Sequence, residues 1–369
     1  MDSAGVGALP DASSYGDAPK ANTIGNVAER LGGLRLPNFE QLGLGRVTPI
    51  RGVAAVDHPL AAVGRLAEQS KGKDTITGHW EMAGIVTEIP FPTYADGFPP
   101  EVVAAFTAIC GKPPLGNVPA SGTEIIAELG EEHQRAGRPI LYTSADSVFQ
   151  VAAHEATVPL PLLYDWCEQA RAMLVPPHAV NRVIARPFVG TPGNYTRTPN
   201  RRDYAIPPPA SILDRLALGG TPVHAVGKIC DIYCGHGIAT SVRVVDNADA
   251  IEKALAIADG MEHGFVFVNL NDFDSKFGHR RNVRGYGDAL ERLDAAIPSI
   301  RARLRPGDGL FFTADHGCDP TAPGSDHTRE YVPYLELGSI AGGDVGTIAG
   351  MSHIGDRVAA ILEAGRVPA

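Results

Sequence analysis

The chain has 369 residues, of which 44% are hydrophobic and 20% charged, and this is ordinary for a globular protein of two domains or of one large domain with an insertion. Its net charge of −10, without a basic stripe, argues against a nucleic-acid binder. The N-terminus lacks a basic region followed by an apolar stretch, no apolar run reaches membrane-spanning length, and the five cysteines are expected to be reduced thiols. We therefore expect a cytoplasmic protein.

The first segment with recognisable chemistry is Gly72–Met82, which reads GKDTITGHWEM. A threonine hydroxyl in this segment could act as a nucleophile if a nearby metal ion lowered its pKa. Asp74 or Thr77 could equally be the N-cap of a helix, and a helix N-terminus also favours bound phosphate. The segment alone leaves the choice between Thr75 and Thr77 open.

The middle of the chain differs in sequence character from the residues before and after it. It is bounded by the proline-rich stretches 90–92 and 207–209. The segments with recognisable chemistry lie mainly before and after it. We therefore expect residues 91–209 to form an inserted domain, and residues 1–90 and 210–369 to form a core.

Short apolar runs predict buried strands, and their alternation with helical patterns predicts an α/β fold with a largely parallel sheet. The predicted strands are Ile140–Tyr142, Val223–Val226, Phe265–Leu270 and Leu310–Phe312. Apolar residues spaced by three and four from Leu290 to Leu304 predict a helix, which Pro298 must kink or end.

Polar side chains follow each predicted strand. They are Ser144 and Asp146, then Lys228, then Asp272 and Asp274, and finally Asp315 and His316. Ligands of open α/β sheets bind beyond the carboxyl ends of the strands. We therefore expect these polar groups to meet at one edge of the sheet.

Two of these groups are rich in potential metal ligands. They lie in residues 272–281 and 314–330, where aspartates and histidines recur. Carboxylates with imidazoles suit Zn²⁺, Mn²⁺ or Fe, and the two groups supply more ligands than one tetrahedral ion needs. The pattern indicates a two-metal site of the kind that serves in-line phosphoryl transfer. A zinc knuckle is not expected, because its conceivable ligands lack paired CxxC spacing: Cys230, Cys234, His236 and Cys318.

These segments together resemble phosphopentomutase over essentially the whole chain. The supporting stretches are 21–25, 42–45, 73–81, 119–124, 142–147, 184–190, 197–201, 227–231, 273–281 and 314–330. The resemblance implies an alkaline-phosphatase-like core, with a mostly parallel sheet flanked by helices, and a smaller inserted α/β cap domain.

The resemblance also implies roles for individual residues. It implies two Mn²⁺ ions, one held by Asp274, His279 and His327, and the other by Asp2, Asp315 and His316 together with the Thr75 oxygen. Thr75 would be the residue that carries phosphate. The residues implied in substrate or phosphate binding are Ser144, Asp146, Arg186, Arg201 and Lys228.

The implied reaction interconverts ribose 1-phosphate and ribose 5-phosphate, and the 2-deoxyribose equivalents, through a phosphothreonine and a bisphosphate intermediate. A sugar bisphosphate, glucose 1,6-bisphosphate or ribose 1,5-bisphosphate, would prime the enzyme. The expected partners are small sugar phosphates, with no nucleic acid, no membrane and no obligatory protein partner. The alternatives are another two-metal enzyme of the superfamily, such as a phosphoglycerate mutase or a phosphatase, and a sugar-phosphate-binding protein without turnover.

The N-terminus departs from the family pattern, in which an apolar strand precedes the first metal-binding aspartate. Here that residue is Asp2. We therefore expect a sheet without its N-terminal strand, Asp2 at a frayed terminus, and weak binding of the second metal ion. The hypothesis that follows is a natural start codon upstream, with Met1 an internal methionine, which mass spectrometry of the native N-terminus would test.

Overall fold

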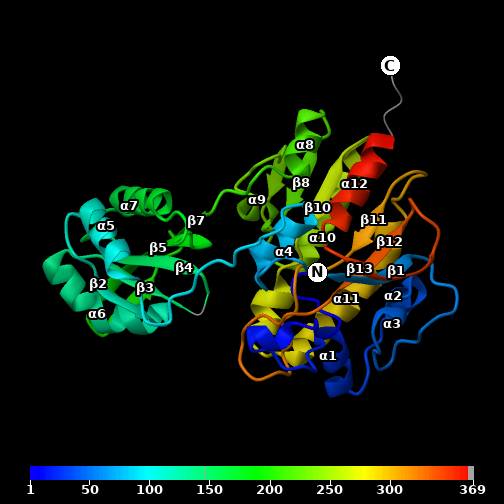
Figure 1. Cartoon of the computed structure of the whole chain (residues 1–369), viewed down its shortest axis with the longest axis horizontal. Coiled ribbons are helices and arrows are strands. Elements are labelled where there is room, and N and C mark those ends of the chain that lie inside the picture. The colour runs from blue at the N-terminus through cyan, green and yellow to red at the C-terminus, as the bar shows by residue number, and fades with distance from the viewer. Residues whose placement is uncertain (145, 365–369) are drawn as a thin grey trace. The chain divides into compact units, whose positions relative to one another are not determined.

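The computed structural model describes residues 1–144 and 146–364 as two compact units, and each unit is α/β (Figure 1). The first unit comprises Met1–Ile89 and the chain from Pro208 onward, and the second comprises Pro90–Pro207. In the described part of the chain, no helix has both the length and the apolar character that crossing a bilayer requires.

The first unit holds two sheets with helices around them. Its helices are η1 (Ala12–Tyr15), α1 (Thr23–Leu31), α2 (Pro37–Leu42), α3 (Leu44–Val47), α4 (Thr75–Met82), α8 (Ile212–Leu218), α9 (Ile229–Ile232), α10 (Asn247–Gly260), η2 (Phe273–Gly278), α11 (Val283–Arg301) and α12 (His353–Ala364). Its strands are β1 (Ala62–Ala67), β8 (Val223–Val226), β9 (Thr240–Val242), β10 (Phe265–Val268), β11 (Leu310–Phe312), β12 (Val332–Leu337) and β13 (Gly343–Ala349). The strand orders are β11-β12-β1-β13 and β10-β8-β9.

The N-terminal residues touch both of these sheets. Among the described residues, β10 pairs with β8 alone and β11 pairs with β12 alone, so each strand leaves one edge unpaired. The Met1 ammonium group donates to the carbonyl of Thr313, just after β11, at 2.9 Å. The N–H of Asp2 donates to the carbonyl of Leu270, just after β10, at 3.4 Å. The chain start therefore lies at the carboxyl ends of both strands.

Helix α11 contains Pro298 and ties α2 to the core. Pro298 has no N–H to give to the carbonyl of Asp294, and that carbonyl accepts from the Asn38 side chain instead, at 3.1 Å. The carboxylate of Asp294 accepts from the N–H groups of Asn38 (3.0 Å) and Phe39 (2.7 Å) at the start of α2. Because the N-cap residue Leu36 has no side-chain oxygen, Asp294 acts as the cap from outside the helix.

Replacing Asp294 with alanine is expected to lower the free energy of unfolding by about 2–3 kcal/mol, since buried N–H groups lose a charged acceptor. Urea unfolding followed by circular dichroism would measure this change. The matched control is Asp288→Ala, which breaks only a surface ion pair with Arg284 on the same helix and is expected to cost less than about 1 kcal/mol. Equal losses in the two variants would contradict the capping role.

The second unit is a six-stranded sheet covered on both faces. Its helices are α5 (Pro100–Cys110), α6 (Gly122–Ala136) and α7 (Leu160–Met173), and its strands are β2 (Leu115–Pro119), β3 (Ile140–Thr143), β4 (Val148–His154), β5 (Arg182–Thr191), β6 (Asn194–Arg197) and β7 (Arg202–Ala205). Alternate residues of β3 serve the two faces: Leu141 packs in a cluster with Phe106 of α5, and Ile140 packs with Ile125 of α6.

The predicted strands 140–142, 223–226 and 310–312 are confirmed as β3, β8 and β11, and the run from 265 forms β10, which ends at Val268. Two expectations are wrong. β11 is antiparallel to its neighbour β12. β3 belongs to the sheet of the second unit, so Ser144 and Asp146 follow a different sheet from the predicted metal ligands.

Candidate metal centre

One group of candidate ligands gathers around the π-helical turn η2. The N–H of His279 donates to the carbonyl of Asp274, five residues earlier, at 3.0 Å, which places both side chains on one side of the turn. The Asp274 carboxylate lies 3.2 Å from Nε2 of His279 and 3.4 Å from Nε2 of His327, and these two nitrogens are 3.1 Å apart. Nδ1 of His279 donates to the Ser325 carbonyl at 2.6 Å, which leaves Nε2 free as a ligand.

A second group of candidate ligands adjoins the first. Nε2 of His316 lies 3.2 Å from Oδ2 of Asp315 and 3.6 Å from Oδ1 of Asp2. The rings of His316 and His327 are 4.0 Å apart between centroids, so the two groups are in contact. The structure thus brings together, within the first unit, all six residues that the resemblance implies as metal ligands.

The expectation that Asp2 would hang at a frayed terminus is wrong. Asp2 is only 1% exposed, and its Oδ2 accepts a hydrogen bond from the Asn269 amide at 3.0 Å. The physical reason is that the backbone of Met1 and Asp2 is hydrogen-bonded to residues just beyond β10 and β11, which fixes Asp2 in place.

The electrostatics of the site fit cations. Three buried carboxylate oxygens have no well-formed hydrogen bond to a described residue, although each has an imidazole nitrogen within 3.6 Å: Oδ1 of Asp2, Oδ1 of Asp274 and Oδ2 of Asp315. Burial, reinforced by Asp315 and Asp274, raises the pKa of Asp2 to about 7. Burial alone would also raise the pKa of Asp274, but the adjacent His327 and His279 hold it well below its usual value. Crowded carboxylates among imidazole nitrogens are the donor set that divalent transition metals favour.

The structure also distinguishes the two threonines. Asp74 is the N-cap of α4 and accepts from the N–H groups of Ile76 (3.0 Å) and Thr77 (3.2 Å). The Thr77 hydroxyl is buried and donates to Asp74 at 2.6 Å, so it is occupied as part of the cap. Oγ1 of Thr75, by contrast, lies 3.2 Å from Nε2 of His316. Thr75 is therefore the threonine that faces the candidate metal ligands.

Helix α4 approaches the metal ligands closely because Gly78 has no side chain. A Cβ atom at Gly78 would lie 2.1 Å from the carbonyl oxygen of Asp315. The missing side chain lets α4 pack directly against the backbone of the loop that carries Asp315 and His316. Thr75, one turn earlier on the same helix, is thereby held near these residues.

Two residues that sequence reasoning did not single out orient the ligands. Nδ1 of His79 lies 2.9 Å from the Thr75 carbonyl and 3.1 Å from the Asp315 carboxylate. Asn269 donates to Asp2. Their positions gave a signal, since His79 stands one helical turn after Thr75 and Asn269 is a polar residue at the end of an apolar run. Such partners of ligands fix ligand orientation.

The predicted substrate residues are divided between the units. Lys228 follows β8 in the first unit and is near enough to Asp2 to oppose the rise of its pKa. The other four lie in the second unit, where Arg186 donates to Gln150 at 3.1 Å and Arg201 forms two 2.6 Å bonds with Asp203. The N–H of Asp146 donates weakly to Ser144 Oγ at 3.4 Å.

Arg186 and Arg201 belong to a positively charged cluster in the second unit. Burial, together with Arg201 and Arg197, lowers the pKa of Arg186. The Tyr142 hydroxyl beside them is buried and has no well-formed hydrogen bond to any described residue. Arg197 was part of the family resemblance but was not predicted as a site residue. The cluster gathers positive charge around a buried hydroxyl, which suits an anion.

Cys318 lies beside the first ligand group, and its sulfur could join Asp274 and His279 as a third ligand. Its sulfur is 3.9 Å from Nδ1 of His279, the nitrogen that faces away from Asp274, and it donates to the Asp326 carbonyl at 3.6 Å. Burial raises the pKa of this thiol far above its usual value, so it stays protonated. Neither Cys230 nor Cys234 belongs to any group of candidate ligands among the described residues, whereas Cys318 does.

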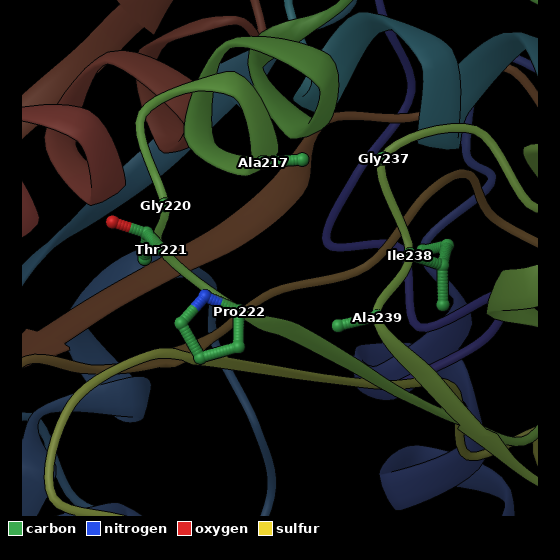
Figure 2. A pocket seen from close by; sticks show the side chains of 7 residues that line it. All are labelled: Ala217, Gly220, Thr221, Pro222, Gly237, Ile238 and Ala239. Carbon is green, nitrogen blue, oxygen red and sulfur yellow. The ribbon is translucent and has the colours of Figure 1, made fainter.

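A shallow recess lies elsewhere in the first unit, where β8 begins. Figure 2 shows the seven residues that line it, among them Ala217, Thr221, Pro222 and Ala239. None of them is charged or a strong metal ligand. Lys228 follows the other end of β8, so the recess is separate from the metal ligands.

Known proteins resemble this chain closely in sequence. A family model described as the metalloenzyme superfamily matches residues 223–362. A phosphopentomutase of Symbiobacterium thermophilum is 56% identical over 366 residues, covering 98% of this chain and 93% of that protein. A phosphopentomutase of Kosmotoga olearia is 55% identical over 340 residues, covering 92% of this chain and 87% of that protein.

Among solved structures, the PH0037 protein from Pyrococcus horikoshii matches 100% of this chain and 97% of its own, with a TM-score of 0.50 and 13% identity. At that identity the likeness shows the fold alone. The two phosphopentomutases show more, because more than half of the aligned positions are identical over nearly the full length of both proteins. The chain therefore belongs to the phosphopentomutase family of isomerases, in the alkaline-phosphatase-like metalloenzyme superfamily.

Proposed function

We propose that this chain is an active phosphopentomutase, which interconverts ribose 1-phosphate and ribose 5-phosphate and their 2-deoxy equivalents, with Thr75 as the residue that carries phosphate. The observation that carries the proposal is the position of Oγ1 of Thr75, 3.2 Å from His316 and beside both groups of candidate ligands. A nucleophile so placed needs no other activating base, because cations at these ligands would lower its pKa.

The proposed reaction has two phosphoryl transfers. In the first, the bond between phosphorus and Oγ1 of Thr75 breaks as the free hydroxyl of a pentose monophosphate takes the phosphoryl group; the proton of that hydroxyl goes to Oγ1, and a 1,5-bisphosphate forms. In the second, Oγ1 of Thr75 gives up this proton and takes the other phosphoryl group of the bisphosphate, and the isomeric monophosphate leaves with the proton on its freed hydroxyl. A sugar bisphosphate, glucose 1,6-bisphosphate or ribose 1,5-bisphosphate, would load Thr75 initially.

The protein groups divide this work. Asp2, Asp315 and His316 would hold one Mn²⁺, and Asp274, His279 and His327 the other. Bound cations supply charge that stabilises phosphoryl oxygens in an in-line transition state. His79 fixes both the Thr75 backbone and the Asp315 carboxylate. Arginines of the second unit would bind the phosphate group that is not being transferred.

Arg186→Met is expected to raise the KM for ribose 5-phosphate about 10- to 100-fold, the loss of one charge-assisted phosphate contact, with a smaller change in kcat. Steady-state kinetics would measure it. Arg202→Met is the matched control, because this substitution removes the same charge from the same sheet. The guanidinium of Arg202 lies 3.9 Å from the centre of the Tyr164 ring. Equal effects of the two substitutions would indicate a general charge effect and contradict a phosphate contact at Arg186.

A coupled assay with Mn²⁺ tests the function itself. Purified protein, primed with glucose 1,6-bisphosphate, is expected to convert ribose 1-phosphate to ribose 5-phosphate and to leave 3-phosphoglycerate unchanged. Mass spectrometry of the primed protein is expected to place phosphate on Thr75. Turnover of 3-phosphoglycerate instead would indicate a phosphoglycerate mutase, release of inorganic phosphate alone would indicate a phosphatase, and binding without turnover would indicate a non-catalytic protein.

A further inference from the structure

One loop of the first unit leads to the nucleophile, and another carries one candidate metal ligand. Each loop has a charged side chain that contacts the other loop. The nucleophile loop (residues 70–75) leads into Thr75, and the ligand loop (residues 326–329) carries His327. Lys73 reaches from the first loop to the second, and Arg329 reaches from the second to the first. Among the described residues, the hydrogen bonds and ion pairs of the Lys73 and Arg329 side chains go to groups other than the candidate metal ligands.

Arg329 holds the backbone of the nucleophile loop. Arg329 is 3% exposed, and its Nη1 donates to the carbonyls of Ser70 and Gly72, each at 2.7 Å. Nη1 also donates to the Glu68 carboxylate at 2.7 Å, and Nη2 donates to the Glu68 carbonyl at 3.0 Å. A planar guanidinium with several fixed acceptors restricts the backbone more than a single bond does.

Lys73 holds the ligand loop from the opposite side. Its ammonium lies 2.9 Å from Asp326 and 2.8 Å from Asp17. Burial by itself lowers the pKa of Lys73, but these two carboxylates raise it above its usual value, so the side chain stays charged. The other oxygen of Asp326 accepts from the N–H of His327 at 2.8 Å. Asp326 therefore links the Lys73 ammonium to the backbone N–H of His327, a candidate metal ligand.

The nucleophile and this ligand also meet through His316. Oγ1 of Thr75 is 3.2 Å from Nε2 of His316, whose ring lies 4.0 Å from the ring of His327. A shift of either loop would therefore change the distance between the hydroxyl and the ligands. Misplacement of reacting groups by 1 Å can cost about 100-fold in rate.

We propose that Lys73, Asp326 and Arg329 are positioning residues, which clamp the nucleophile loop to the ligand loop and so set the position of Thr75 relative to the metal ligands. This clamp acts on the chemical step and leaves substrate binding to other residues. The kinetic part of its test rests on the proposed function, whereas the structural part does not.

The experiment compares Lys73→Met, Asp326→Asn and the double variant with the wild type. Each single substitution is expected to lower kcat at saturating Mn²⁺ by about tenfold or more, with KM for ribose 5-phosphate within about twofold. The kcat of the double variant is expected to match that of the less active single variant within about twofold, because both substitutions break the same contact. Arg329→Lys, which keeps the charge but loses the planar fork, is expected to lower kcat as well.

Hydrogen–deuterium exchange of a peptide covering residues 70–77 is measured on the same proteins. Exchange is expected to rise in Lys73→Met and Asp326→Asn and to stay unchanged in Lys253→Met, which breaks a surface ion pair with Asp249. Unchanged exchange and kcat in Lys73→Met, or losses that multiply in the double variant, would overturn the proposal. A wild-type chain without mutase turnover would refute the proposed function, and the exchange data would still decide whether the clamp exists.

Discussion

Thr75→Ala is expected to lower mutase turnover by at least about 10³-fold while the protein stays folded and still binds Mn²⁺, as removal of a nucleophile typically does. The fold should tolerate the change because Thr75 is the first residue of α4, alanine is a good helix former, and the cap is supplied by Asp74. The coupled assay, a thermal unfolding curve and a Mn²⁺ titration measure the three quantities.

Thr77→Ala is the matched control for this prediction. It also removes a threonine hydroxyl from α4, but one that donates to Asp74. We expect it to cost about 1 kcal/mol of stability, as the loss of one hydrogen bond does, and to keep measurable turnover. Thr75→Ser, which keeps a hydroxyl, should restore part of the activity. If Thr75→Ala turned over like the wild type, the nucleophile would have to be another residue, with Thr77 the first to test.

The strands could be predicted from sequence because short apolar runs persist whatever the pairing. Val223–Val226 and Leu310–Phe312 are strands as expected. Which strands become neighbours depends on the whole topology, and the antiparallel pairing of β11 with β12 had no local signal. The expectation of a single sheet was too simple, because β10 and β11 belong to two sheets of the first unit whose following residues still gather, and β3 belongs to the sheet of the second unit.

Most candidate ligands could be predicted because aspartates and histidines recur in residues 272–281 and 314–330, whereas Asp2 was implied only by the family resemblance, and the arrangement of the ligands could not be predicted. Asp274 and His279 are aligned by a π-helical turn, which has no simple sequence pattern. Pro298 was expected to kink or end a helix, and it lies in the last turn of α11, which ends at Arg301. The contact of Arg329 with Gly72 joins residues far apart in the chain, and single-sequence patterns carry no information on such pairs.

The second large effect is expected from Asp274→Asn. Asp274 lies within 3.4 Å of both His279 and His327, and its Oδ1 is buried without a well-formed hydrogen bond to a described residue. The amide that replaces it has no charge and can turn an NH₂ group toward two imidazole nitrogens that should face a cation. A cation at this position would lose its only carboxylate ligand of this group, so its affinity should fall at least about 100-fold.

We therefore expect Asp274→Asn to bind one Mn²⁺ where the wild type is expected to bind two, and to lose turnover by at least about 10³-fold, since one cation would not clamp both oxygens of the transfer. Metal content by mass spectrometry after dialysis and the coupled assay measure both effects. Asp272→Asn is the matched control two residues away, because Asp272 pairs with Lys276 at 3.0 Å and belongs to neither ligand group. Two bound Mn²⁺ ions in Asp274→Asn, or an equal loss of metal in Asp272→Asn, would show that the carboxylate of Asp274 is not a ligand. Full metal content with lost turnover would instead assign Asp274 a role in the reaction apart from metal binding.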